Sequence, residues 1–218
     1  MSQLRIGIYA PLMPDGGAGG VEQYVIGLVS GLNKLNPENL EFVLITHPFH
    51  PDWIDKYAGE QMRVEPRPPF GMVEQIGTAL GPLRKKLKPI AKPILNMWQN
   101  DETVSVPTGG KWLDSLNIDV IHFATQKYVR TGIESVYNPH DLQHRHFPEF
   151  FDESTIQWRE TIYQIGCEEA NTIGVASHWI KNDIVEQYAI DPSKIVVIPT
   201  APPVEAYPEI DENDLKAT

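Results

Sequence analysis

The first part of the chain constrains the fold most strongly. A short apolar run at residues 4–9 is followed by a loop with four glycines and two prolines at 11–20. Apolar residues then recur at three- and four-residue spacing over 21–35, and a second apolar run occupies 42–46. Strand, glycine-rich loop, helix and strand form one βαβ unit, and such units build parallel sheets. The sequence therefore predicts an α/β fold with a doubly wound, mostly parallel, Rossmann-like sheet.

The remaining pattern extends this plan after an irregular stretch. Residues 50–115, termed the variable region, contain a short expected strand at 62–64 and several prolines that interrupt any helix, so we expect an irregular structure there. Further strands are predicted at 119–123, 135–137, 172–176 and 195–198, and helices at 111–116, 154–170 and 178–188. We expect one domain over residues 1–201 and a Pro-rich, acidic linker or tail over 202–218.

Two serines are predicted to cap the last two helices. Ser154, with Gln157 three residues later, has the spacing of a capping box for the helix at 154–170. Ser177 follows an expected strand directly and is predicted to cap the helix at 178–188 beside a ligand cleft.

Charge and cysteine content limit the possible partners. The net charge is −11, which repels phosphate backbones, so nucleic acid is not an expected partner. Cys167 is the single cysteine, so no disulfide within the chain is possible. No apolar run approaches the ~20 residues of a membrane span. We expect a cytoplasmic protein, with peripheral contact at the inner face of the membrane as an option.

The sequence DGGAGGVEQY at residues 15–24 is a candidate anion site. Glycines before a helix let an anion approach the backbone, and the helix N-terminus offers free N–H groups and a positive dipole end. The spacing matches neither GxGxxG nor a Walker A loop. The glycines could equally serve only the turn, and Glu22 could complement the helix dipole or belong to the site.

Residues 138–151, NPHDLQHRHFPEFF, place three histidines near Asp141, Arg145 and Glu149 in a loop after a strand. Histidine and aspartate can hydrogen-bond sugar hydroxyls, and the phenylalanines can pack on a sugar face or on the core. The three imidazoles could instead bind a metal, but their spacing matches no standard zinc motif. A third option is that the histidines hydrogen-bond loop carbonyls.

A basic stretch stands out in an otherwise acidic chain. Five basic residues lie within nine positions and alternate with apolar ones: Arg84, Lys85, Lys86, Lys88 and Lys92. They could contact an anionic membrane or hold an anionic acceptor, or they could form the solvated face of an irregular helix.

Three segments together resemble glycosyltransferase family 4, the retaining GT-B enzymes: GGAGGVEQYV, VYNPHDLQHRHFPEFF and IGVASHWIKNDIVEQYAIDPSKIVVIPTAPP. The resemblance implies that this chain is the N-terminal, acceptor-side domain. It implies that Gly19, Gly20 and Val21 lie against the donor diphosphate. His140 would contact the transferred sugar, and Asp141 would support that loop or touch the acceptor.

The resemblance also implies acceptor binding by residues of the variable region and by Glu22, Gln126, Lys127, Arg130 and Arg145. It implies a nucleotide-sugar substrate and no metal or other cofactor. Family members carry a second, C-terminal domain that binds the nucleotide with a Lys/Arg pair and a Glu-x7-Glu motif. We expect this chain to depend on such a domain or subunit and to be inactive alone.

The resemblance implies hexosyl transfer to a hydroxyl of a glycan or lipid-linked acceptor, as in polysaccharide biosynthesis. The likeness of PHDLQHRHFPEF, residues 139–150, to mannosyltransferase-like members suggests that the hexose is mannose. The alternative is a non-catalytic acceptor-binding or regulatory subunit of a split glycosyltransferase. A dehydrogenase is disfavoured by the glycine spacing. A dinucleotide-binding fold would also place an acidic residue at the end of the second strand, whereas this chain has His47 and Pro48 there.

Overall fold

A computed structural model describes residues 3–13, 19–70, 75 and 104–200. Its strands form one seven-stranded parallel sheet in the order β3-β2-β1-β4-β5-β6-β7. The predicted α/β, doubly wound, parallel sheet is therefore confirmed. The strands are β1 (Leu4–Tyr9), β2 (Leu40–Thr46), β3 (Met62–Pro66), β4 (Val120–Phe123), β5 (Glu134–Tyr137), β6 (Thr172–Val175) and β7 (Ile195–Val197).

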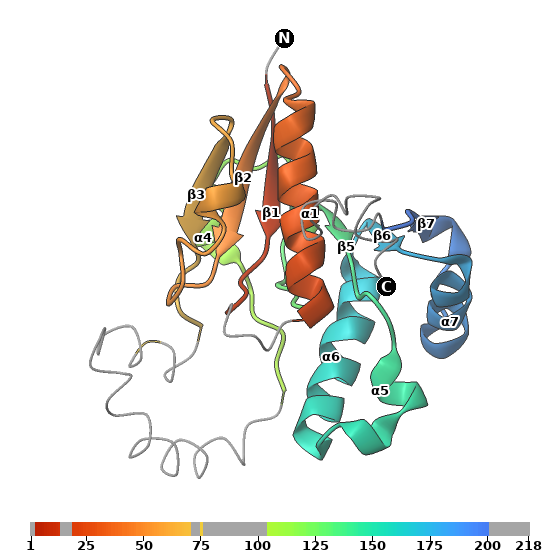
Figure 1. The fold of residues 1–218 in the computed structure, drawn as a ribbon. Coiled ribbons are helices and arrows are strands. Elements are labelled where there is room, and N and C mark those ends of the chain that lie inside the picture. The colour runs from red at the N-terminus through yellow and green to blue at the C-terminus, as the bar shows by residue number, and fades with distance from the viewer. Residues whose placement is uncertain (1–2, 14–18, 71–74, 76–103, 201–218) are drawn as a thin grey trace, which may run out of the picture.

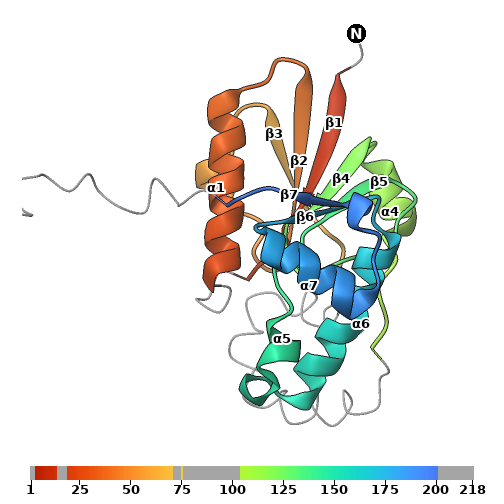
Figure 2. The ribbon, with the colours of Figure 1, turned by 90° about the vertical axis from the view of Figure 1, so that its right-hand side faces the viewer.

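Helices cover both faces of this sheet (Figure 1). Figure 2 shows α1 on one face, with α4 and α6 on the other. The α-helices are α1 (Gly19–Leu35), α4 (Gly110–Ser115), α5 (Gln143–His146), α6 (Glu153–Glu169) and α7 (His178–Tyr188). Short 3-10 turns are η1 (Asp55–Tyr57), η3 (Pro148–Phe150) and η4 (Pro192–Lys194).

The central strands are buried on both faces, which explains their continuous apolar runs. In β2, Phe42 and Leu44 join the core under α1, whereas Val43 and Ile45 join the larger core under α4 and α6. Because side chains alternate along a strand, one short apolar run supplies both cores.

Two details at the helix starts differ from the sequence prediction. The N-cap of α6 is Asp152, whose carboxylate accepts a hydrogen bond from the Thr155 N–H at 2.8 Å. The capping box predicted at Ser154 is therefore wrong, because a carboxylate two residues earlier caps the helix instead. Residues 138–151, predicted as loop, contain α5 and η3. The cap at Ser177 is confirmed, since its Oγ accepts from the Ile180 N–H at 3.2 Å.

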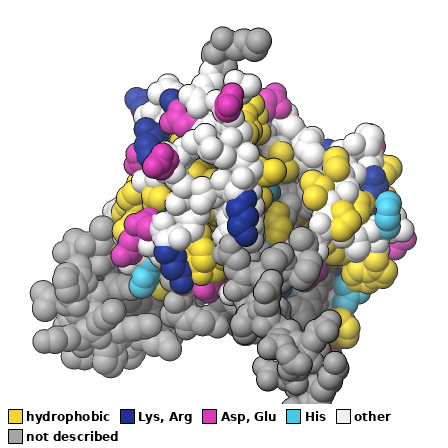
Figure 3. Space-filling model, turned by 45° about the horizontal axis from the view of Figure 1, so that its top comes forward, with side chains coloured by type: hydrophobic (Ala, Val, Ile, Leu, Met, Phe, Trp, Pro, Cys, Tyr) yellow, Lys and Arg dark blue, Asp and Glu magenta, His cyan; other side chains and the backbone are white. Residues whose placement is uncertain are grey.

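The face that carries α1 is only partly covered by the described residues. A groove of about 810 Å³ runs beside α1 over β4, β5 and β6. Val120 and His122 of β4 point into it, while Ile121 and Phe123 face the opposite core. Figure 3 shows the surface hollowed here, with hydrophobic side chains in the hollow.

Some sequence predictions lie outside the described residues. These are the basic stretch at Arg84, Lys85, Lys86, Lys88 and Lys92, and the tail at 202–218. Among the described helices, none combines the length and apolar character needed to cross a bilayer.

Candidate functional site

The strand order reverses between β1 and β4, which lie side by side although a long stretch of chain separates them. In open parallel sheets, ligands bind beyond the carboxyl ends of the strands at such a switch point. The segments that follow β1, β4, β5 and β6 therefore define the candidate site. The start of α1 and the loop with His140 belong to this edge.

His140 follows β5 closely and is held from two sides. Its Nε2 lies 3.1 Å from the backbone oxygen of Ala124, which follows β4. Its ring meets the ring of Tyr24, in the second turn of α1, edge to face at 5.0 Å and 87°. The backbone of His140 is left-handed, with φ +69°, a conformation that non-glycine residues adopt at a cost of about 1–2 kcal/mol.

These contacts define the chemistry that His140 can offer. A carbonyl oxygen only accepts, so Nε2 carries the proton and Nδ1 keeps its lone pair in the neutral ring. Burial lowers the pKa of His140, with partial opposition from the Ala124 hydrogen bond and from Asp141. The imidazole is therefore mainly neutral at pH 7, and its Nδ1 can accept a hydrogen bond from a hydroxyl.

The N-terminus of α1 lies at the same edge. Gly19 is exposed and has φ +49°, which is a conformation that glycine adopts without strain. Gly20 is exposed too, and a Cβ there would meet nothing within 4 Å. Among the described residues, none blocks the approach of an anion to the first turn of α1, at Gly19, Gly20 and Val21. Glu22 lies in this turn, where a carboxylate complements the helix dipole.

Asp141 organises the loop next to His140. Its Oδ1 accepts a hydrogen bond from the Gln143 N–H at 3.1 Å, at the start of α5. A turn closed by an aspartate side chain is a common way to begin a helix.

The loop after β4 is tied to the loop after β1. The Nζ of Lys127 donates to the Pro11 oxygen at 3.0 Å, and the Gln126 oxygen accepts from the Tyr137 hydroxyl at 2.9 Å. Gln126 and Lys127 therefore lie at the switch point, where acceptor-binding groups were predicted.

Two other predicted acceptor residues are engaged elsewhere. The Nε of Arg130 lies 2.9 Å from the carboxylate of Glu169. Because Glu169 is the last residue of α6 and comes shortly before β6, Arg130 lies toward the amino ends of the strands. Arg145 forms two hydrogen bonds with Glu160, at 2.8 and 2.6 Å, and reaches Gln187. Its guanidinium also lies over the Tyr188 ring at 4.5 Å. Their acceptor roles stay predictions, and these placements do not favour them.

The other two histidines of this segment have separate partners. His144 is buried, with Nε2 3.1 Å from the Glu160 carboxylate, and burial lowers its pKa. His146 Nε2 lies 2.9 Å from both oxygens of Asp183 on α7. Within the described part of the chain, no three His, Cys, Asp or Glu side chains gather as metal ligands. The three histidines therefore do not form a joint ligand set there.

Sequence reasoning missed three residues that connect the site: Tyr24, His122 and Asn138. The Nδ2 of Asn138 donates to the Tyr24 hydroxyl at 2.9 Å, and His122 lines the same groove as these two residues. The available signal was their position, because Asn138 is the first residue after β5 and His122 interrupts an apolar strand.

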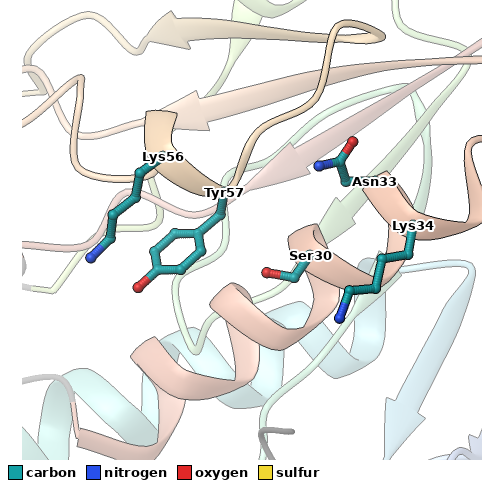
Figure 4. A pocket seen from close by; sticks show the side chains of 5 residues that line it. All are labelled: Ser30, Asn33, Lys34, Lys56 and Tyr57. Atoms are coloured by element: carbon teal, nitrogen blue, oxygen red, sulfur yellow. The ribbon is translucent and has the colours of Figure 1, made fainter. Parts of the chain in front are cut away.

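A second, smaller pocket lies away from this site. It has a volume of about 130 Å³ and lies between the C-terminal half of α1 and η1, where Ser30, Asn33, Lys34, Lys56 and Tyr57 line it (Figure 4). Because α1 runs back from the carboxyl edge, this pocket is at the opposite end of the helix from His140.

The sequence itself identifies the family. The family model described as Glycosyltransferase Family 4 matches residues 18–205. The chain belongs to glycosyltransferase family 4. The match covers α1, the His140 segment and everything up to the end of the sheet. No curated protein matches the chain.

This family 4 chain also resembles solved structures at low identity. The structure of Anabaena HepE in complex with UDP and glucose matches 91% of this chain, with 16% identity and a TM-score of 0.47. A glycosyltransferase from Rickettsia africae matches 91% of this chain with 14% identity and a TM-score of 0.40. A putative UDP-N-acetylglucosamine 2-epimerase from Listeria monocytogenes matches 90% of this chain with 10% identity and a TM-score of 0.48. The chain spans only 44, 43 and 45% of these proteins, respectively.

Proposed function

We propose that this chain is the acceptor-side half of a retaining glycosyltransferase. It acts with a C-terminal domain or subunit that binds the nucleotide-sugar, and it is inactive without that partner. The enzyme moves a hexosyl group to a hydroxyl of a glycan or a lipid-linked acceptor. Family membership supports sugar transfer, and the neutral imidazole of His140 beside the start of α1 is the observation that carries the proposal.

The two groups suit two parts of a nucleotide-sugar. The exposed first turn of α1 presents N–H groups and a positive dipole end to the diphosphate, whose negative charge grows as the glycosidic bond breaks. His140 Nδ1 accepts a hydrogen bond from a hydroxyl of the transferred sugar. We propose that helix dipoles and basic groups of the partner domain, without a metal ion, stabilise the leaving diphosphate.

Mannose is the hexose that we propose first, because residues 139–150 resemble the corresponding segment of mannosyltransferase-like members. Gln126 and Lys127 lie at the same edge and are the proposed acceptor contacts among the described residues. Closure of the two domains excludes water, which otherwise competes with the acceptor hydroxyl.

The test is a transfer assay on the complete two-domain enzyme with a panel of UDP- and GDP-sugars. His140→Ala should lower kcat/KM about 10- to 100-fold, because a sugar hydroxyl loses its partner in a site closed to water. Gln164→Ala, at an exposed position of α6 whose side chain hydrogen-bonds Glu168, is the control and should change nothing. Equal rates for wild type and His140→Ala would instead favour a non-catalytic, acceptor-binding or regulatory role for the chain.

A further inference from the structure

One buried amide, that of Asn138, connects α1 to the His140 loop. Asn138 is 9% exposed, and its Nδ2 donates to the Tyr24 hydroxyl at 2.9 Å. His122 of β4 lines the same groove as Tyr24 and Asn138. A buried amide held by a hydrogen bond such as that to Tyr24 is a rigid connector, because losing the bond leaves a desolvated polar group.

Tyr24 extends this connection to His140. Its hydroxyl binds Asn138, and its ring meets the His140 ring at 5.0 Å and 87°. Residues 138 and 140 belong to one short segment, so Tyr24 contacts that segment at two points. The left-handed backbone of His140 persists only where surrounding contacts enforce it.

Gly174 makes room for the amide. A Cβ built on this residue of β6 would lie 2.5 Å from Asn138 Oδ1, closer than any real contact. Glycine in a strand interior weakens the strand and commonly marks a close approach by another group. Here that group is the Asn138 side chain, which fills the space that a side chain at 174 would occupy.

We propose that Tyr24, Asn138 and Gly174 position the sugar site by fixing the start of α1 at a set distance and angle from the His140 imidazole. This inference rests on the proposed function, since it assigns the diphosphate to α1 and the sugar to His140. Catalytic groups tolerate misplacement poorly, and an error of about 1 Å can lower a rate 100-fold. The connector acts through His140 and does not itself touch substrate.

A purely structural role for these residues would give a different result. If these groups only satisfied one another's hydrogen bonds, removing one would lower the stability of the chain. The tautomer and the pKa of the His140 ring would then stay unchanged. A positioning role changes that ring even where stability is kept. The tautomer and the titration of His140 therefore separate the two roles.

The experiment records long-range ¹H–¹⁵N spectra of the histidine rings in the chain itself across pH. In the wild type, His140 should show a single Nε2–H tautomer and a pKa below 6.5. Tyr24→Phe keeps the ring contact but removes the hydroxyl, and it should give a mixture of tautomers and a pKa closer to 6.5. Gly174→Ala should act in the same direction by displacing Asn138. Tyr57→Phe, a tyrosine at the far end of the same groove, is the matched control.

Kinetics of the complete enzyme give the second readout. Tyr24→Phe should lower kcat about tenfold with little change in donor KM, because the ring of Tyr24 and the helix end remain in place. An unchanged His140 spectrum in both Tyr24→Phe and Gly174→Ala overturns the positioning proposal, whatever the rates. A changed spectrum with an unchanged rate supports the connector but contradicts the catalytic role of His140, so the two proposals fail separately.

Discussion

The contact between Gly166 of α6 and Tyr137 of β5 allows a stability prediction of defined sign. A Cβ on Gly166 would lie 2.6 Å from Tyr137 Cε1 and 2.9 Å from Cδ1 and Cζ, whereas ordinary contact begins at 3.4 Å. The ring must therefore move by about 0.8 Å, the difference between 3.4 and 2.6 Å. Tyr137 is fully buried and its hydroxyl is bound to Gln126, so the ring has little freedom to move.

The expected magnitude combines two opposing effects in Gly166→Ala. Alanine in place of a helical glycine gains roughly 1 kcal/mol, and overpacking of a dense core costs about 1–3 kcal/mol. Gly27→Ala in α1 is the matched control, because a Cβ there meets nothing within 4 Å and only the gain remains. The helix propensity cancels between the two variants, so Gly166→Ala should be about 1–3 kcal/mol less stable than Gly27→Ala.

Urea unfolding of the wild type and both variants, followed by circular dichroism, measures this difference. Each kcal/mol should also appear as a shift of about 2–4 °C in Tm for a chain of this size. If Gly166→Ala were as stable as Gly27→Ala, then α6 would not pack on Tyr137 as closely as described, and the steric argument would be refuted.

Three further predictions concern titration, reactivity and packing. Burial lowers the pKa of His122 to about 4, so only the unfolded chain takes up this proton as pH falls from 6.5. Stability should therefore fall between pH 6.5 and 4 by up to about 3 kcal/mol, and urea titrations should show a smaller fall in His122→Gln. Burial raises the pKa of Cys167 to about 12, so a thiol reagent at pH 8 should label it only in urea, and prompt labelling of the native chain would contradict its burial. Arg145→Lys should lower the free energy of unfolding by roughly 1 kcal/mol, because lysine cannot bridge Glu160 and Gln187. The acceptor KM of the complete enzyme should stay constant in this variant, and a raised KM would indicate that Arg145 does bind the acceptor.

The secondary structure was accessible from sequence because it depends on local patterns. A short apolar run before a glycine- and proline-rich loop placed β1 at residues 4–9, and the cap at Ser177 placed α7 at 178–188, as observed. The pattern failed where competing local signals were close together. Asp152 and Ser154 are both good caps, and only the geometry of the chain entering α6 shows that the aspartate makes the bond.

The sequence alone determined the parallel α/β plan, the family, and the edge of the sheet at which the start of α1 and His140 lie, because strand direction follows from short-range patterns and topological rules. Only the tertiary structure decided which side chains of residues 138–151 face that edge. Arg145 and His146 turn toward Glu160 and Asp183, and Asn138 turns toward Tyr24, which is 114 positions away in the chain. Such partners are distant in sequence, and the direction of a side chain depends on where its partner is packed, which local patterns do not encode.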